Sequence, residues 1–208
     1  NWTADGPVTR TARANWQRKI AGEITAYVDT LHNDAKNQLG TLIARSGANP
    51  RFYIFNSLSW ARTDYADFPV SNKNLIHVVD VTTGQQVPSQ YVTVGGKTRL
   101  RILASNVPSV GYKVFEIRSG VGNSFSDAAI VSGNIIENDF YRIKVSNTGA
   151  ITSLIDKTRG DREFVRTING LTVNDLGGIG GSLTVENAGA VSVTLRATSL
   201  NPYSLTSR

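Results

Sequence analysis

The sequence predicts a mainly β protein, an antiparallel β-sandwich preceded by one long α-helix. Three observations favour this fold class. Between residues 9 and 45, apolar residues recur at spacings of three and four, which is typical of an amphipathic helix. After Pro50 the period falls to two, and turn signals follow at short intervals, as in antiparallel sheets. Only 18% of the residues are charged, and glycine, serine, threonine and asparagine are plentiful, as in many β-rich proteins.

The helix is expected within an N-terminal segment, residues 1–48. Pro7 favours its start, and Gly47 with Pro50 favours its end. A rod over residues 9–45 would be about 55 Å long and cannot bury its apolar stripe alone. We therefore expect partner helices of a bundle, from the same parent protein or from another subunit, and a homo-oligomer stays an open alternative. The stripe comprises Trp16, Ile20, Ile24, Tyr27, Val28, Leu31, Ala35, Leu39 and Leu42.

The β domain is predicted over residues 51–208, with its sheet incomplete at the end. The hairpin within residues 135–159 has the clearest pattern, because Tyr141, Ile143 and Val145 alternate with basic residues before a turn at 146–149. The other predicted strands lie within residues 51–60, 74–94, 98–117 and 190–198, and residues 176–182 are predicted as a glycine-rich loop.

Composition narrows the classes of protein. The 208 residues can form one large domain or two small ones. The chain has no cysteine, so disulfides and cysteine-based zinc sites are excluded. No apolar run is long enough to span a bilayer, and we expect no membrane partner. Because the chain starts with Asn1 and contains no methionine, we expect a piece of a longer protein. The low charge favours a periplasmic or secreted bacterial location without deciding the compartment.

The basic balance raises nucleic acid as a partner, since the net charge is +6 and the pI is near 9.7. The basic residues are scattered, however, and the densest group alternates with carboxylates. Such mixed charge is typical of a solvated surface with ion pairs. We therefore expect no nucleic-acid partner. The group consists of Lys157, Arg159, Arg162 and Arg166, with Asp156, Asp161 and Glu163 between them.

Other motifs have structural interpretations. Residues 94–98, VGGKT, end like a phosphate-binding loop but continue as a strand, so they are predicted as a Gly-Gly hairpin turn. His32 and His77 are too few for a histidine-rich zinc site. Carboxylates suited to glycoside hydrolysis lie beside turns among basic residues, where ion pairs are the simpler interpretation. These carboxylates are Glu137, Asp139, Asp156, Asp161 and Glu163.

Four stretches, in their order and spacing, carry a resemblance to one enzyme family. They are FNSLSWART (55–63), VPSQ (87–90), NVPSVGYKVF (106–115), and the hairpin positions Glu137, Asn138, Phe140, Tyr141, Gly149, Ile151, Ser153, Leu154, Asp156 and Lys157. Together they resemble the β region of the glycoside hydrolase family 38 α-mannosidases, which follows the catalytic domain. Ser57 stands where that family usually has proline.

The resemblance implies a parent enzyme that hydrolyses terminal α-mannosides of oligosaccharides or glycans with retention, using zinc and an aspartate nucleophile. The family's zinc-binding motifs do not occur in this sequence. We therefore predict no catalytic residue and no metal ligand here, and we expect zinc only in the parent enzyme and no activity from the fragment alone. Substrate-binding residues stay undetermined. The implied fold is a bundle helix followed by part of a galactose mutarotase-like supersandwich. The implied partners are the parent's catalytic domain, its bundle helices and the α-mannoside.

A different class, a carbohydrate-binding β-sandwich without hydrolase activity, is the alternative. Such a module needs exposed aromatic rings that stack on sugars. Trp60, Tyr65, Tyr91 and Tyr112 are the candidates. A long amphipathic helix has no evident role in a free-standing module, which favours the enzyme fragment.

Overall fold

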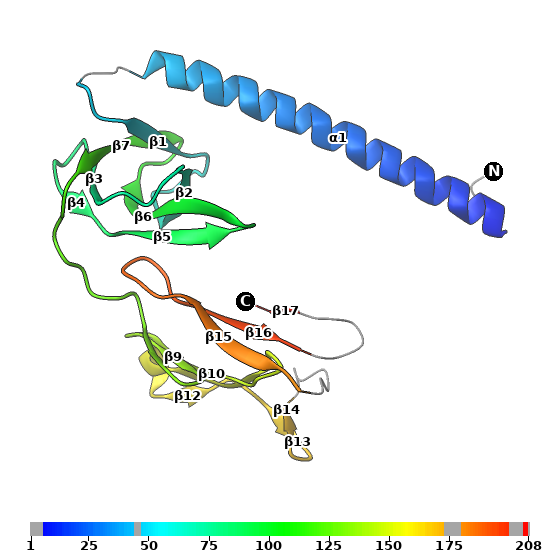
Figure 1. The fold of residues 1–208 in the computed structure, drawn as a ribbon. Helices are drawn as coiled ribbons and strands as arrows, with labels where there is room; N and C mark the ends of the chain where they lie inside the picture. Colours follow the sequence, from blue (N-terminus) through cyan, green and yellow to red (C-terminus); the bar gives the residue numbers. More distant parts are fainter. Residues whose placement is uncertain (1–5, 44–46, 173–179, 200–205, 208) are drawn as a thin grey trace. The chain divides into compact units, whose positions relative to one another are not determined.

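The computed structural model describes residues 6–43, 47–172, 180–199 and 206–207. The chain divides into two compact units, Asn1–Ala48 and Asn49–Arg208. Figure 1 shows a single helix in the first unit and strands in the second. The predicted class, mainly antiparallel β with one long N-terminal helix, is confirmed.

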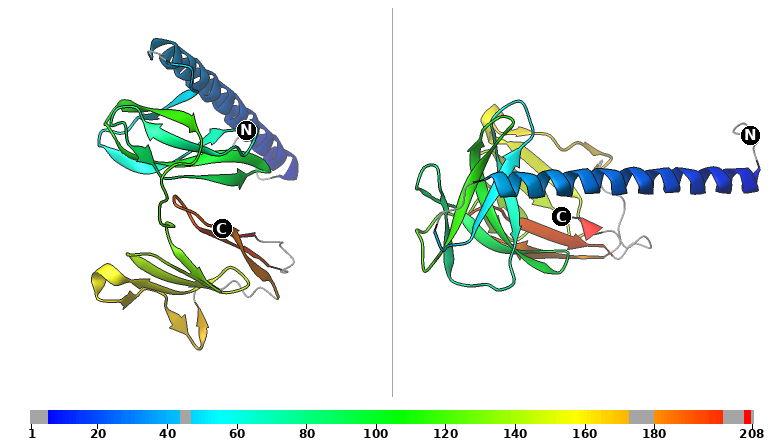
Figure 2. Two further views of the ribbon diagram at one scale, coloured as in Figure 1. Left: turned by 60° about the vertical axis from the view of Figure 1, so that its left-hand side comes forward. Right: turned by 90° about the horizontal axis from the view of Figure 1, so that it is seen from above.

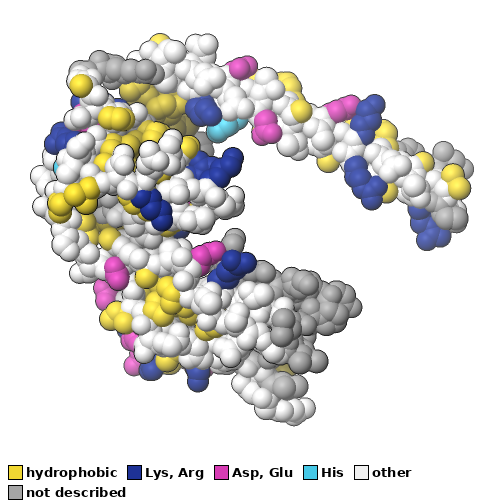
Figure 3. Space-filling view, viewed as in Figure 1, with side chains coloured by type: hydrophobic (Ala, Val, Ile, Leu, Met, Phe, Trp, Pro, Cys, Tyr) yellow, Lys and Arg dark blue, Asp and Glu magenta, His cyan; other side chains and the backbone are white. Residues whose placement is uncertain are grey.

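Helix α1 runs from Pro7 to Leu42, so it begins two residues and ends three residues before the predicted bounds. Pro7 occupies the first turn, where a missing backbone N–H costs nothing. Ile43 ends the helix with an extended backbone, and its N–H donates to the Leu39 carbonyl at 3.1 Å. In Figure 3, apolar side chains are interspersed with polar ones along the helix.

The stripe on α1 is largely open to solvent. Six of its side chains, Trp16, Ile24, Tyr27, Val28, Leu31 and Leu42, are between 51% and 81% exposed. A single helix offers no second apolar surface within itself, so these side chains contribute little stability to it. None of the described residues forms a helix long and apolar enough to cross a membrane.

The first lobe of the β unit, residues 51–119, contains two antiparallel sheets (Figure 2). One has the order β1-β7-β3-β4 and the other β2-β6-β5. The bounds are β1 Arg51–Asn56, β2 Arg62–Pro69, β3 Ile76–Asp80, β4 Gln86–Val87, β5 Ser89–Val94, β6 Lys97–Val107 and β7 Gly111–Ser119.

The buried core of the first lobe joins the two sheets. On β6, Leu100, Ile102 and Ala104 are buried at every second position, as expected for a strand with one face inward. Phe115 of β7 is fully buried against them. The ring of Phe52 stacks on Phe115, with centroids 5.7 Å apart. These contacts make the lobe a two-layered sandwich with its own apolar core.

The second lobe, residues 130–172, 180–199 and 206–207, contains a five-stranded antiparallel sheet with the order β12-β11-β10-β9-β8. Its strands are β8 Ile130–Ser132, β9 Ile135–Glu137, β10 Tyr141–Val145, β11 Ile151–Asp156 and β12 Arg162–Glu163, with the short helix η1 at Lys157–Arg159. The remaining strands are β13 Thr167–Ile168, β14 Leu171–Thr172, β15 Ser182–Asn187, β16 Thr194–Thr198 and β17 Thr206–Ser207.

The predicted hairpin is present as β10 and β11, with Ile143 opposite Leu154. Gly149 has a φ of 90°, a conformation that favours glycine, and its N–H donates to the Ser146 carbonyl at 3.0 Å. Tyr141 is the most exposed of the three alternating residues, at 44%. It begins the strand, where the sheet covers little of the side chain.

Other boundaries also differ. β2 was not predicted, because Asp64 at a less exposed position and Tyr65 at an exposed one break its alternation, although Phe68 packs against the core. The strand expected over residues 190–198 begins only at Thr194. The predicted Gly-Gly turn does join β5 to β6, with positive φ at both glycines. Residues 176–179 of the predicted loop lie outside the described residues.

Candidate functional site

Two of the four stretches that carry the family resemblance meet at one end of the first lobe. Asn56, which is buried, joins them with its side chain. Its Nδ2 donates to the Trp60 carbonyl at 2.8 Å, to Val107 at 3.1 Å and to Pro108 at 3.0 Å. Its Oδ1 accepts from the Leu58 N–H at 3.1 Å. We call this region, residues 54–65 and 104–112, the motif end.

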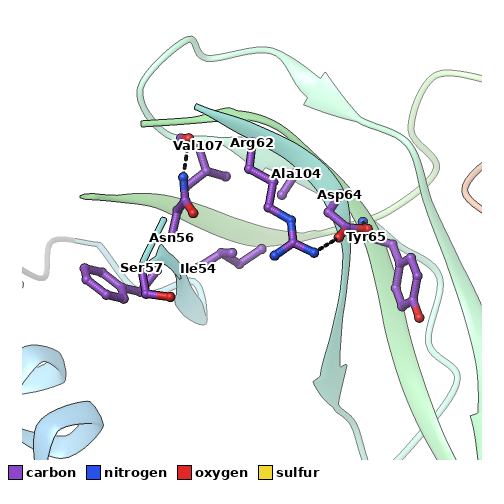
Figure 4. A pocket seen from close by; sticks show the side chains of 9 residues that line it. Ile54, Asn56, Ser57, Arg62, Asp64, Tyr65, Ala104 and Val107 are labelled. Atoms are coloured by element: carbon purple, nitrogen blue, oxygen red, sulfur yellow. Dashed lines mark hydrogen bonds and ion pairs between the residues drawn. The ribbon is translucent and has the colours of Figure 1, made fainter. Parts of the chain in front are cut away.

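A pocket of about 220 Å³ opens at the motif end (Figure 4). Part of its lining is apolar, and part is polar through Ser57, Arg62 and Asp64. Arg62 Nη2 forms an ion pair with Asp64 Oδ2, and the Tyr65 N–H donates to Asp64 Oδ1 at 2.8 Å. The full lining is Ile54, Phe55, Asn56, Ser57, Arg62, Asp64, Tyr65, Ala104 and Val107.

The chemistry of this pocket suits binding better than catalysis. The Arg62–Asp64 pair is neutral overall and combines donors with acceptors, and Ser57 adds a hydroxyl. Phe55 and Trp60 are exposed aromatic residues of the same motif end. A binding site for a sugar needs hydrogen-bonding groups for the sugar hydroxyls, beside an aromatic ring on which the sugar ring can stack. The lining contains one carboxylate, Asp64, which pairs with Arg62, whereas glycoside hydrolysis uses two carboxylates.

Three of the four aromatic residues predicted as sugar-stacking candidates lie at the motif end and are exposed: Trp60, Tyr65 and Tyr112. The guanidinium of Arg101 covers one face of Tyr65 at 4.2 Å. Tyr91 is different, because it is half-buried and its hydroxyl donates to the Asn74 carbonyl at 2.8 Å. Burial raises the pKa of Tyr91. Tyr91 therefore presents no free ring face of the kind that the binding hypothesis needs.

The hairpin carboxylates lie in ion pairs and turns. Glu137 is 2.6 Å from Lys157 Nζ, and this hydrogen bond lowers the pKa of Glu137. Asp156 accepts from the Thr158 hydroxyl at 2.6 Å and from its N–H at 2.9 Å, which lowers the pKa of Asp156. Hydrogen bonds from Ser153 and two backbone N–H groups lower the pKa of Glu163. A general acid in a glycosidase needs a raised pKa, so these three groups suit structure better.

The remaining carboxylates of that set, Asp139 and Asp161, lie in connections between strands. Asp161 has a φ of 58°, between η1 and β12. Of the nearby basic residues, Lys157 pairs with Glu137 and Arg159 lies 3.5 Å from Asp156, while the Arg162 guanidinium is 5.1 Å from the Phe164 ring. Lys157, Arg159 and Arg162 therefore have partners within the protein.

Two buried carboxylates were not singled out from the sequence. Glu116 accepts from Arg118 at 2.8 Å, from Arg51 at 2.6 Å and from Asn49 at 3.3 Å. These hydrogen bonds, that of Arg118 first, lower the pKa of Glu116 to about 2. The detectable signal was the register, since Arg51 and Glu116 are directly opposite on β1 and β7. The site joins neighbouring strands and has no open position for a ligand group.

Asp80 is the second of them. Burial raises the pKa of Asp80. The hydrogen bonds from the Lys113 ammonium at 2.8 Å and from the Thr82 N–H outweigh this effect, so the net shift of the pKa is downward. Lys113 and Asp80 come from β7 and β3, which pair in the same sheet. The ion pair therefore supports the sandwich.

The histidines do not converge. His32 is exposed on α1, whereas His77 Nδ1 lies 3.1 Å from the Gly120 carbonyl oxygen. In the part of the chain that the structure describes, no three His, Cys, Asp or Glu side chains are grouped as a metal site would require. These residues therefore do not fit a bound zinc ion.

Comparison with known proteins shows first which fold the chain shares. No protein-family model matches the chain. The crystal structure of an α-mannosidase from Enterococcus faecalis has the same fold, with a TM-score of 0.54 and 14% identity over 82% of this chain and 26% of that one. A glycosyl hydrolase family 38 protein from the same species aligns over 72% of this chain and 24% of its own, with 15% identity and a TM-score of 0.46.

A particular relative is similar in sequence. Over 139 residues the chain is 30% identical to lysosomal alpha-mannosidase of Dictyostelium discoideum. The aligned region covers 55% of this chain and 14% of the relative. The resemblance to glycoside hydrolase family 38 α-mannosidases, predicted from the motifs, is thereby confirmed. The chain spans only a small part of the length of these relatives.

Proposed function

We propose that the chain is a non-catalytic part of a zinc-dependent, retaining α-mannosidase that hydrolyses terminal α-mannosides of oligosaccharides or glycans. The observation that carries the proposal is the 30% identity to an α-mannosidase over 139 residues. Among the described residues, no three His, Cys, Asp or Glu side chains are grouped as metal ligands. The substrate, the zinc and the stereochemical outcome are the family's properties, extended here to the parent protein.

The physical role in this proposal is support. A zinc ion and a nucleophilic carboxylate act only when a rigid surrounding structure holds them in position. The first lobe has the fully buried core that a rigid support needs. The exposed stripe of α1 suits packing against further helices of the same protein, and the β unit suits contact with its catalytic domain.

The test compares two polypeptides. One is the 208-residue chain, and the other is the natural protein that contains it, extended towards the N-terminus. We expect the longer protein to hydrolyse an aryl α-mannoside and to lose this activity in a zinc chelator, with recovery on added zinc. A longer protein that does not hydrolyse α-mannosides but hydrolyses another glycoside would contradict the substrate assignment.

A second candidate function is carbohydrate binding by the motif end. It is favoured by the pocket with its Arg62–Asp64 pair and by the exposed ring of Trp60. Titration of the 208-residue chain with mannose oligosaccharides, followed by amide NMR, tests it. Binding that Trp60→Ala removes and Phe140→Ala preserves would support this function. Phe140 is a suitable control because it is an equally exposed aromatic residue in the other lobe, 58% against 60%.

A further inference from the structure

Two glutamine side chains of the first lobe bind backbone outside that lobe. Gln86 Nε2 donates to the Asn123 carbonyl at 3.2 Å, and the Asn123 N–H donates to Gln86 Oε1 at 2.7 Å. Gln90 Nε2 donates to the Ser192 carbonyl at 3.0 Å, and the Ser192 N–H donates back to Gln90 Oε1 at 3.0 Å. Each side-chain amide thus pairs with both polar groups of one backbone residue.

This arrangement replaces a strand pairing. A primary amide has the same donor and acceptor as a peptide group, so it can satisfy a residue that has no neighbouring strand. Residues 120–129 connect the lobes without strands, and residues 188–193 form the loop between β15 and β16. Gln86 holds the first of these segments and Gln90 holds the second.

The environment of Gln90 is built around this contact. Gln90 Oε1 also accepts from the Val191 N–H at 2.8 Å, and Gln90 Nε2 lies 3.3 Å from Asn187 Oδ1. Arg101 Nη1 donates to Ser192 Oγ at 3.0 Å. The same guanidinium donates through Nε to Asp67 Oδ1 at 2.7 Å and through Nη2 to Asp67 Oδ2 at 2.8 Å. The loop is therefore bound by side chains from two strands of the first lobe, Gln90 of β5 and Arg101 of β6.

Gly189 leaves room for the Gln90 side chain. A Cβ atom at Gly189 would lie 2.7 Å from Gln90 Oε1 and 3.0 Å from its Cδ. Gly189 also accepts, through its carbonyl, a hydrogen bond of 2.9 Å from the Ala128 N–H at the end of the connection. The glycine thus brings the loop, the connection and Gln90 together.

We infer that Gln90 is a positioning residue that fixes the 188–193 loop, and through it the second lobe, on the first lobe. In the described residues no sheet contains strands of both lobes, and the main apolar core belongs to the first lobe. Polar side-chain contacts to backbone are therefore well placed to set the position of the second lobe. Gln90 is also the last residue of the VPSQ stretch, for which this role provides a physical reason. The inference is independent of the proposed enzymatic function.

Hydrogen exchange of backbone amides tests this role in the 208-residue chain. In Gln90→Ala we expect the Val191 and Ser192 amides to exchange at least tenfold faster, while amides of β3 and β7 keep their rates. Gln85→Ala is the matched control, because Gln85 is an exposed glutamine of the same segment. Unchanged exchange at Val191 and Ser192 in Gln90→Ala, or an equal change in Gln85→Ala, would overturn the inference.

A second variant, Gly189→Ala, keeps the test decisive if Gln90→Ala folds poorly, and the double variant tests whether the two residues act through one contact. Gly189→Ala displaces the Gln90 amide without removing it, so we expect a similar acceleration at Val191 and Ser192. In the Gln90→Ala background the same substitution has no amide to displace and should add less than twofold. Effects that multiply independently would show that the two residues do not act through one contact.

Discussion

The two lobes of the β unit have similar strand patterns but differ in what their strands bury. In the first lobe, two facing sheets enclose Val78, Leu100, Ile102 and Phe115, each at most 1% exposed. In the five-stranded sheet of the second lobe, the alternating apolar residues of β10 and β11 are only half-buried. Alternation therefore predicts a strand in both lobes, but a closed core forms only where a second apolar layer faces the strand.

The two lobes also differ in how far apart in the sequence their hydrogen-bonded polar residues lie. In the first lobe, buried Asn56, Asp80 and Glu116 each join strands or stretches far apart in sequence. In the second lobe, Asp156 and Asn138 bond mainly to residues two or three positions away. Long-range polar contacts fix a tertiary arrangement, whereas local ones shape turns. We expect substitutions in the first lobe to cost more stability, and the following variants can break or sharpen this difference.

The largest effect is expected from the core. Phe115→Ala removes a fully buried ring that stacks on Phe52, so the free energy of unfolding should fall by about 3–5 kcal/mol. Ile143→Ala, in the half-buried face of β10, should cost about 1–2 kcal/mol because less apolar area is lost. Urea denaturation followed by circular dichroism measures both. Equal losses would show that the second lobe is as well packed as the first.

The next effect compares two asparagines. Asn56→Ala leaves buried carbonyls of two distant stretches without their donor, so we expect a loss of about 2 kcal/mol. Asn138→Ala removes acceptors only for the exposed Phe140 and Tyr141 N–H groups, which water can replace, and should cost less than about 1 kcal/mol. The same denaturation experiment applies. A larger loss from Asn138→Ala would reverse the comparison.

Acid should affect the first lobe through Glu116. Its pKa is lowered from 4.5 to about 2. The stabilisation from this shift is complete above the unfolded pKa and is lost as the pH falls towards the folded pKa. We therefore expect the melting temperature of the natural sequence to fall between about pH 4.5 and pH 2, and Glu116→Gln to flatten this dependence. Melting curves at several pH values check it, and an unaltered acid slope in Glu116→Gln would contradict it.

The smallest effect is expected at Ser57. The family resemblance places proline here, and Asn56, the preceding residue, already has the extended backbone that proline favours. Ser57→Pro should change the free energy of unfolding by less than about 1 kcal/mol, with stabilisation the expected direction. A marked loss of stability would show that the motif turn differs from that of the family.

Much of the fold followed from the sequence because the period of the apolar residues indicates the type of secondary structure. The long helix, the 141–155 hairpin and the Gly95-Gly96 turn were predicted from local pattern alone. β2 was missed because Asp64 stands in its less exposed set of positions and Tyr65 in its exposed set, which breaks the alternation of apolar and polar residues. The Glu116 cluster and the Gln90 contacts depend on residues 65 to 102 positions apart, so only a known register or loop position could reveal them.

The candidate site was predictable only in part. Trp60, Tyr65 and Tyr112 were predicted as candidates for sugar contacts, and the structure places them at the motif end. The pocket itself forms where Arg62 and Asp64, two positions apart on β2, form an ion pair at a shift in the pairing register of β2 and β6. A bulge of this kind leaves no signal in local composition.

The most direct measurement is the hydrolysis of an aryl α-mannoside by the purified 208-residue chain with zinc added. We expect a rate equal to that of buffer alone, because the described residues contain no group of His, Cys, Asp and Glu side chains that could hold the zinc ion of the proposed parent enzyme. A rate that saturates with substrate and follows the chain through purification would contradict the central claim that this part of the protein is non-catalytic.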